Sequence, residues 1–471
     1  MADYKAVPVR KLRTVDVEES DTPRQQWSFL HSRTELNLHQ FLIMTIGGAV
    51  LSCAFGFAAL PLANPLHSSR TTTWMCPLAC GVVWEGLSTA YIVKLLNQFV
   101  HAPHNDTVHC TEAVSLWLIS ASLATAGMMA LPLLYYPFPL SAFILAPLCF
   151  GSMLLYYRCK VYPRLPPEAT GKAMRVFAFF IFGDVIFLAL IIAIAMVQTK
   201  WVYMKGLGLA VLKIGFTSVS NKIAKQVDDK AIILGTSLVE IGASVVICVF
   251  AAQRMTPYVL VFVMVFDLLA GFAVALAVGQ TSVFGITIGH YMLFPDRYAK
   301  RALNRMVGST DSDANDNAAP FNQDELAAKI YEKRTFLACS ELSEVLTPVV
   351  YAACWLVIFF GPNANAFTGV GTSEYGVEPP DNVPRYLAKL LVIATFQFLS
   401  LGVIHLFMKC LKDESGFNLQ HLLTEYGVVW SLQTIWVVNT SFCAMMLSCG
   451  LDYSLHWNSH PTTITASTTG V

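Results

Sequence analysis

Two glutamates three residues apart, Glu341 and Glu344, lie in the sequence CSELSEVLTP, at the start of a stretch that is otherwise apolar. Residues three or four apart share one face of a helix, so both carboxyl groups would face the same neighbour. Two carboxylates in a low-dielectric seam cannot both ionise cheaply, and one is expected to hold or exchange a proton. This pair suits a proton or a hard cation. The alternative is a polar seam in which one glutamate is neutral and hydrogen-bonded.

The helix that carries these glutamates is expected to be polar along one stripe. Pro348 has no N–H, so the carbonyl of Glu344 loses its helical partner and stays free to bind a cation or a donor. Phe336, Val345, Leu346 and Val349 are expected to face away from the stripe. The stripe itself comprises Ser340, Glu341, Glu344, Thr347, Pro348 and Tyr351.

Four more acids, Glu85, Asp184, Glu240 and Asp267, also fall within apolar segments. An ionised side chain at the centre of a membrane helix costs about 2.5–3.5 kcal/mol, so several of them indicate a function. Lys213 lies in the middle of a short apolar segment and needs a carboxylate partner there. Asp184, Glu240 and Asp267 are the candidates. The alternative is a static ion pair that only fixes the register of the helices.

The composition favours a membrane protein. Of the 471 residues, 55% are hydrophobic and 13% are charged, whereas soluble domains average about 25% charged residues. The formal net charge is zero, which argues against a nucleic-acid partner. The chain contains no GxSxG, HExxH, Walker A or dinucleotide-binding motif, so we expect no cofactor and do not favour an enzyme.

Eleven segments are long and apolar enough to span a bilayer, which needs about 20 residues. The fold class expected is therefore all-α, a polytopic integral membrane protein of the plasma membrane or an endomembrane. Of the 31 Lys and Arg residues, 23 fall on one side of the resulting arrangement and 5 on the other. This bias predicts a cytoplasmic N-terminus and an external or lumenal C-terminus. The segments are 40–62, 75–98, 113–134, 138–157, 174–197, 204–220, 231–252, 257–283, 335–360, 386–408 and 428–449.

The predicted organisation has five parts: a cytoplasmic tail (1–39), spans one to eight (40–294), a cytoplasmic loop (295–334), spans nine to eleven (335–449) and an external tail (450–471). The first eight spans are expected to end in a segment broken by three glycines, GQTSVFGITIGHY, that is re-entrant or lies on the membrane surface.

Two matching sequences suggest an internal repeat. Glu85 in WEGLSTA and Glu240 in VEIGASV lie five predicted spans apart, and each acid is followed by glycine and serine. An odd number of spans per repeat reverses orientation, so a 5+5 inverted repeat plus one helix would fit.

Two loops carry weaker candidates. His101, His104, His109 and Cys110 offer ligands for zinc or copper, with a solvated histidine-rich turn as the alternative. In the 297–305 region four basic residues share a helical face that suits anionic lipid, namely Arg297, Lys300, Arg301 and Arg305.

The function expected from these features is secondary transport of a small solute, coupled to protons or another cation. The partners would be the lipid bilayer, the solute and the coupling ion. A receptor or assembly scaffold, whose buried charges only pair helices, is the competing class. A lipid-modifying enzyme would require its acids to cluster at one membrane face, whereas these are spread along the spans.

Overall fold

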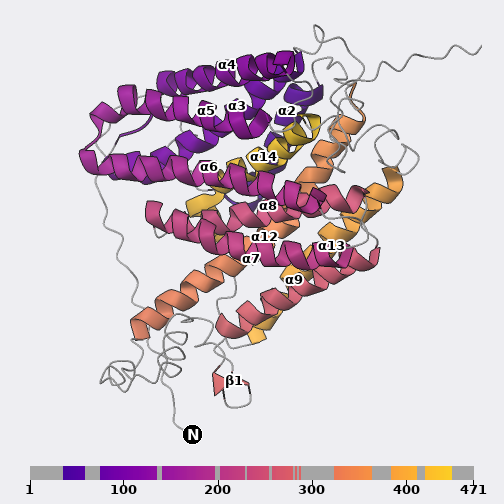
Figure 1. Cartoon of the computed structure of the whole chain (residues 1–471). Coiled ribbons are helices and arrows are strands. Elements are labelled where there is room, and N and C mark those ends of the chain that lie inside the picture. Colours follow the sequence, from indigo (N-terminus) through magenta and orange to yellow (C-terminus); the bar gives the residue numbers. More distant parts are fainter. Residues whose placement is uncertain are drawn as a thin grey trace, which may run out of the picture.

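The computed structural model is helical nearly throughout the residues it describes. These are 36–58, 75–104, 106–134, 141–196, 202–228, 231–253, 257–278, 282–283, 286–287, 323–362, 383–410 and 419–447. In this part of the chain the helices form eleven segments, and each overlaps one of the eleven predicted apolar segments. The all-helical fold class is thereby confirmed (Figure 1).

The first helical segment is a continuous run of α1 (Leu38–Leu42), η2 (Ile43–Gly47), α2 (Gly48–Cys53) and η3 (Ala54–Ala58). It begins at a capping box, in which the side chain of Asn37 accepts from the backbone N–H of Gln40 and the Gln40 side chain accepts in return. The other ten segments are α3 (Met75–Leu96), α4 (Cys110–Leu134), α5 (Ser141–Tyr156), α6 (Pro167–Met196), α7 (Val202–Val227), α8 (Ile232–Gln253), α9 (Pro257–Val278), α12 (Gln323–Phe359), α13 (Val383–Cys410) and α14 (Leu419–Leu447).

Short turns extend two of these helices. The π-helical turn η4 (Asn97–His101) and the 3₁₀ turn η5 (Ala102–His104) follow α3. In the same way η6 (Tyr157–Val161) and η7 (Tyr162–Arg164) follow α5. Both α6 and α9 begin with proline, which suits the first helical position because that N–H has no helical partner.

Two boundaries differ from the expected organisation. Helix α12 begins at Gln323, inside the predicted loop 295–334, so part of that loop is helical. Helix α9 ends at Val278, where the broken segment was expected to begin. Beyond it, β1 (Ser282–Val283) pairs antiparallel with β2 (Ile286–Thr287), and these are the strands found in the described residues. The basic face at 297–305 and the chain beyond residue 447 lie outside the described residues.

Three described helices are long and apolar enough to cross a membrane: Leu38–Phe57, Lys333–Phe359 and Tyr386–Lys409. They contain 20, 27 and 24 residues, against about 20 needed for a span. Ile232–Cys248 and Leu260–Leu276 are shorter apolar helices. The orientation of the chain in a bilayer stays a prediction.

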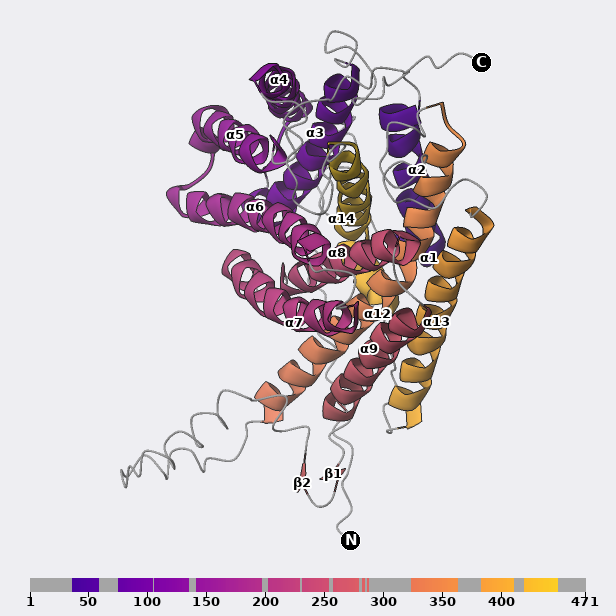
Figure 2. The ribbon, with the colours of Figure 1, turned by 45° about the vertical axis from the view of Figure 1, so that its right-hand side comes forward.

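Helix α14 lies at the centre of the molecule, among α2, α3, α8 and α12 (Figure 2). From Tyr426 to Phe442 every residue is buried. Polar side chains on a helix that is surrounded on all sides find most of their hydrogen-bond partners on neighbouring helices. Accordingly, Trp430 donates to Ser343 of α12 at 3.1 Å, and Thr45 of the first segment shares a hydrogen bond with Ser431 at 2.7 Å.

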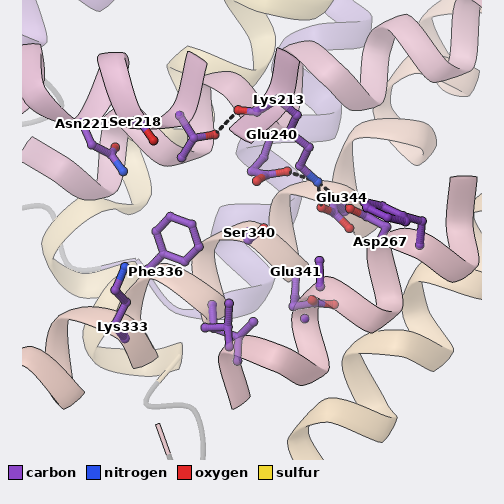
Figure 3. Close-up of a pocket in the computed structure, with 16 residues that line it drawn as sticks. Lys213, Ser218, Asn221, Glu240, Asp267, Lys333, Phe336, Ser340, Glu341 and Glu344 are labelled. Carbon is purple, nitrogen blue, oxygen red and sulfur yellow. Dashed lines mark hydrogen bonds and ion pairs between the residues drawn. The ribbon is translucent and has the colours of Figure 1, made fainter. Parts of the chain in front are cut away.

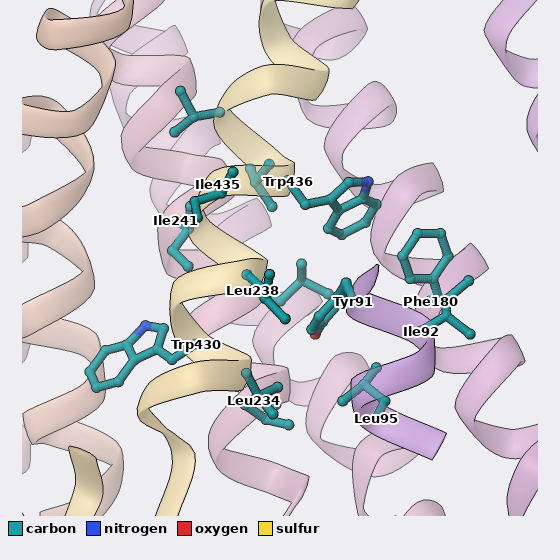
Figure 4. Close-up of a cluster of buried hydrophobic side chains, with 14 of the residues drawn as sticks. Tyr91, Ile92, Leu95, Phe180, Leu234, Leu238, Ile241, Trp430, Ile435 and Trp436 are labelled. Atoms are coloured by element: carbon teal, nitrogen blue, oxygen red, sulfur yellow. The ribbon is translucent and has the colours of Figure 1, made fainter. Parts of the chain in front are cut away.

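Large apolar side chains fill the space around α14 (Figure 4). The ring of Trp436 lies 5.5 Å from that of Tyr91 on α3 and 4.4 Å from that of Phe180 on α6. Side chains of α8 join this cluster from the other side, and Gln433 of α14 donates to the carbonyl of Leu234 at 3.0 Å. This packing fixes α8 and α12 against α14, and both helices carry acids of the site described next.

Candidate functional site

The Lys213 ammonium group is held by carboxylates from three other helices (Figure 3). Its Nζ lies 2.6 Å from Glu240 Oε2 of α8, 2.7 Å from Asp267 Oδ1 of α9 and 2.6 Å from Glu344 Oε1 of α12. The lysine itself lies in the middle of α7, and its side chain is 18% exposed. Helix α7 ends at Val227 and α8 begins at Ile232, and these two helices pack together, which brings Lys213 opposite Glu240.

The three contacts to Lys213 are not equivalent. Lys213 donates hydrogen bonds to Asp267 and Glu344. Glu240 Oε2 is an ion-pair partner by distance, yet it accepts no aligned hydrogen bond from the described residues. Gln397 of α13 donates to Asp267 Oδ2 at 3.3 Å.

A cavity of about 260 Å³ opens beside this cluster, between α7, α8, α9 and α12. On α12 its wall runs from Lys333 through Phe336 and Ser340 to Glu341 and Glu344. Lys333 and Asn221 lie at the end away from Lys213, and the acids lie at the other end (Figure 3). The Lys333 ammonium lies 5.4 Å from the centre of the Phe336 ring. The cavity therefore has a cationic end, an apolar middle and an acidic end.

Glu341 lines the acidic end and is 4% exposed. Its Oε2 accepts a hydrogen bond from Ser400 of α13 at 3.3 Å. Gly271 of α9 faces it closely, since a Cβ there would lie 2.8 Å from Glu341 Oε1 and 2.6 Å from Ile404 Cδ1. The missing side chain of this glycine leaves room for the close approach of α9 to Glu341 and Ile404.

The charges of the cavity do not balance when every group is ionised. The lining holds the carboxyl groups of Glu240, Asp267, Glu341 and Glu344 but the ammonium groups of only Lys213 and Lys333. Uncompensated buried carboxylates are costly, so such a site favours bound protons or added cations. The arrangement can therefore exchange protons for another positive charge.

The structure brings together five of the seven residues proposed from the sequence: Lys213, Glu240, Asp267, Glu341 and Glu344. The position of Asp184 is within α6, but its side chain lies outside the described residues. The predicted position of Phe336 was wrong. It lines the cavity because it precedes Ser340 by four residues and so shares its face of α12. Val349 is 41% exposed and faces away as expected.

Glu85 lies in different surroundings. It is fully buried in α3 and accepts a hydrogen bond from Ser120 of α4, whose carbonyl accepts in turn from Cys149 of α5. Its Oε1 has no hydrogen-bond partner in the described residues. The structure does not bring Glu85 to the Lys213 cavity, whose lining it does not join.

Next to Glu85, α3 and α14 pack together and bury polar atoms without described hydrogen-bond partners. The two helices run antiparallel, because Tyr91 stacks on Trp436 while Gln98 donates to the carbonyl of Glu425. We call this contact the α3–α14 seam. Its unpartnered atoms belong to Trp84, Ser88 and Tyr91 of α3 and to Trp436, Asn439 and Thr440 of α14.

The weaker metal candidates do not converge. His101 is buried, with Nε2 3.0 Å from Tyr157 OH and Nδ1 3.2 Å from Asp106 Oδ2. Burial lowers the pKa of His101 despite the hydrogen bond that its ring forms with the Asp106 carboxylate. His104, His109 and Cys110 are exposed. Among the residues described, no three His, Cys, Asp or Glu side chains are grouped to hold a metal ion.

Sequence reasoning missed the contribution of α13 and of Gly271. Gln397 and Ser400 each hydrogen bond to an acid of the site. These polar residues lie three apart in the apolar sequence TFQFLSLG, a spacing that places them on one helical face. That spacing was the signal for a further polar wall.

Comparison with protein families, curated proteins and solved structures gave no match to this chain. Its function must therefore be argued from the site itself.

Proposed function

We propose that this chain is a multi-pass membrane transporter that couples movement of a small solute to protons or another cation. Support for a membrane location comes from helices whose outward faces are apolar. Large hydrophobic side chains of α13 and α9 are exposed in rows, as suits contact with lipid. On α13 they are Leu391, Val392, Phe398, Leu399, Val403 and Leu406.

The observation that carries the proposal is the convergence of Lys213 with acids from α8, α9 and α12 beside a cavity. A lysine that only fixes helix register needs one carboxylate. Three carboxylates around one ammonium give it alternative partners, and protonating one acid changes which helices it holds. Intramembrane ionisable groups that face a cavity are typical of ion and proton pathways.

Alternating partners supply two states of the molecule. When a proton neutralises Glu344, Lys213 is held by Asp267 and Glu240, and the attraction between α7 and α12 weakens. When Glu344 ionises, that attraction returns. A solute that favours one of these states would be coupled to protonation by its different affinity for the two.

In the proposed arrangement the N-terminus is cytoplasmic and the C-terminus is external or lumenal, with Lys333 towards the cytoplasmic side. An epitope inserted at 308–322 should be reached only from the cytoplasm, and one at 361–385 only from the opposite side. A glycan on Asn105 would contradict this orientation.

The function is tested with purified protein in proteoliposomes that carry a pH gradient and an internal pH indicator. Amino acids, sugars, nucleosides and small amines are added separately. At least one of them should speed the loss of the gradient. Glu344→Gln keeps the shape of the side chain but cannot titrate, so the variant should fold and lose this proton movement.

A receptor or assembly scaffold is the second candidate, favoured by the observation that Lys213 already engages three of the four acids. A protein that reconstitutes in folded form but moves no protons with any solute class would belong to this second class.

A further inference from the structure

We propose that the cavity beside Lys213 binds a small organic ammonium ion at Glu341, in exchange for a proton. The inference rests on the proposed function and deepens it, because it names the chemical class of the solute and the atom that couples it to protons.

Glu341 is the acid of the cavity that does not form an ion pair with Lys213. Lys213 contacts the other three carboxylates of the cavity. Within the described part of the chain, the Glu341 carboxylate accepts a hydrogen bond from the Ser400 hydroxyl, at the long distance of 3.3 Å. An uncharged donor at this distance does little to offset a buried negative charge. A cation at Glu341 would offset it directly.

Lys213 shows which kind of cation this chemistry accepts. Its ammonium group lies within 2.7 Å of oxygens from Glu240, Asp267 and Glu344. An ammonium group has three N–H donors, and carboxylate oxygens are acceptors in several directions. Glu341 with the Ser340 hydroxyl beside it offers a second set of acceptors in the same cavity.

The size and lining of the cavity limit the rest of the ligand. At about 260 Å³ it is smaller than the pockets of about 300–1,000 Å³ that hold drug-sized ligands. From Glu341 the wall continues to the apolar ring of Phe336 and then to Lys333 (Figure 3). A short aliphatic chain on the ammonium would lie against Phe336. A carboxylate at the far end of that chain would approach Lys333.

The exchange step balances in charge and atoms. Before binding, the carboxylic acid of Glu341 holds one proton. As R–NH₃⁺ enters, this proton leaves to water, and the resulting carboxylate pairs with the ammonium. One positive charge leaves for each one that enters, so the net charge of the cavity stays constant. A proton and an ammonium ion cannot occupy Glu341 together. The proton and the ammonium ion are therefore predicted to cross the membrane in opposite directions.

The test uses the purified full-length protein in detergent, in a weakly buffered solution with a pH indicator. Addition of n-butylammonium should release about one proton per ligand bound, and 1-butanol should release none. If binding displaces one proton, the apparent affinity should weaken about tenfold for each unit by which the pH is lowered within the range where Glu341 is protonated in the free protein. This measurement needs only wild-type protein.

Variants locate the effect. Glu341→Gln should abolish proton release and weaken binding at least tenfold. Gly271→Ala keeps every charge but places a methyl group against Glu341 Oε1, so it should also weaken binding. The matched control is Glu168→Gln, an exposed position at the start of α6, which should behave as wild type.

4-Aminobutyrate carries the same ammonium group on a chain that ends in a carboxylate. Proton release by either n-butylammonium or 4-aminobutyrate supports the proposal.

Two results would overturn the inference: wild-type protein that binds neither n-butylammonium nor 4-aminobutyrate, or binding with no proton release and an affinity that does not change with pH. Proton release that persists in a folded Glu341→Gln variant would overturn the assignment to Glu341. The proposed transport function is judged separately, since a sugar, nucleoside or other solute could still drive proton flux in proteoliposomes.

Discussion

The Lys213 site and the α3–α14 seam are both buried and polar, but they satisfy their polar groups in different ways. At the Lys213 site, three carboxylates lie 2.6–2.7 Å from one ammonium group. In the seam the polar atoms are mainly hydroxyl and indole groups, and several lack hydrogen-bond partners in the described residues. In a charged cluster, protonation of one acid changes which ion pairs form. A neutral seam holds its helices together largely through its apolar surface.

The largest expected effect is that of removing the one cation that holds the cluster. Lys213→Ala leaves the carboxylates of Glu240, Asp267 and Glu344 without their shared partner, and breaking a buried pair in this way costs about 3–5 kcal/mol. The variant should therefore unfold at a clearly lower temperature in detergent. A variant that melts and transports like wild type would show that the cluster is solvated and dispensable.

A smaller effect is expected when one acid is removed instead of the lysine. Glu240→Gln leaves two carboxylates around Lys213, and the Glu240 contact lacks hydrogen-bond alignment. We expect a loss of about 1 kcal/mol, in the range of a single hydrogen bond. Comparison of its melting temperature with that of Lys213→Ala measures how much more the lysine contributes to stability than one of its acids. Equal losses would mean that Lys213 and Glu240 form an exclusive pair.

In the seam, loss of a polar group should cost little. Thr440 is 4% exposed, and its hydroxyl has no described partner. Thr440→Val has nearly the same shape, so the melting temperature should change by the equivalent of about 0.5 kcal/mol or less, because no paired hydrogen bond is broken. Destabilisation by more than about 1 kcal/mol would show that this hydroxyl is bonded and that the contrast between the two regions is weaker.

The smallest effect concerns His101, which lies outside both regions. Because burial lowers the pKa of His101, the unfolded chain takes up its proton more readily than the folded chain. This contribution to stability is complete above the unfolded pKa of about 6.5 and is lost as the pH falls towards the folded value. His101→Gln should reduce the pH dependence of the melting temperature below about pH 6.5. An unchanged profile would assign that dependence to other groups.

The helices could be predicted from the sequence because each requires a long apolar run, a local property. The acids of the site could also be predicted, since a carboxylate within such a run is costly wherever the run packs. The partners could not. Asp267 and Glu240 were among the candidates for Lys213, but Glu344 was assigned to a separate pair with Glu341. Only the packing of α7 and of α12 against α8 and α9 brings positions 131 residues apart into hydrogen-bonding contact.

Phe336 and Gly271 show two further limits. Phe336 was placed on the wrong face because apolar character was given more weight than its four-residue spacing from Ser340. The role of Gly271 depends on how closely α9 approaches Glu341 and Ile404, and no local pattern specifies that distance.

Helix α12 continues through Pro348, only one turn beyond Glu344. Proline at this position weakens the helical hydrogen bonding of the Glu344 carbonyl, so the helix bends more easily there than elsewhere. From Glu344 back to Gln323 the helix contains no proline and extends about 31 Å. A rotation of about 10° at the proline would displace Gln323 by about 5 Å, one helical turn. A bend at Pro348 caused by protonation in the cavity would thus move the start of α12, which lies well away from the acids.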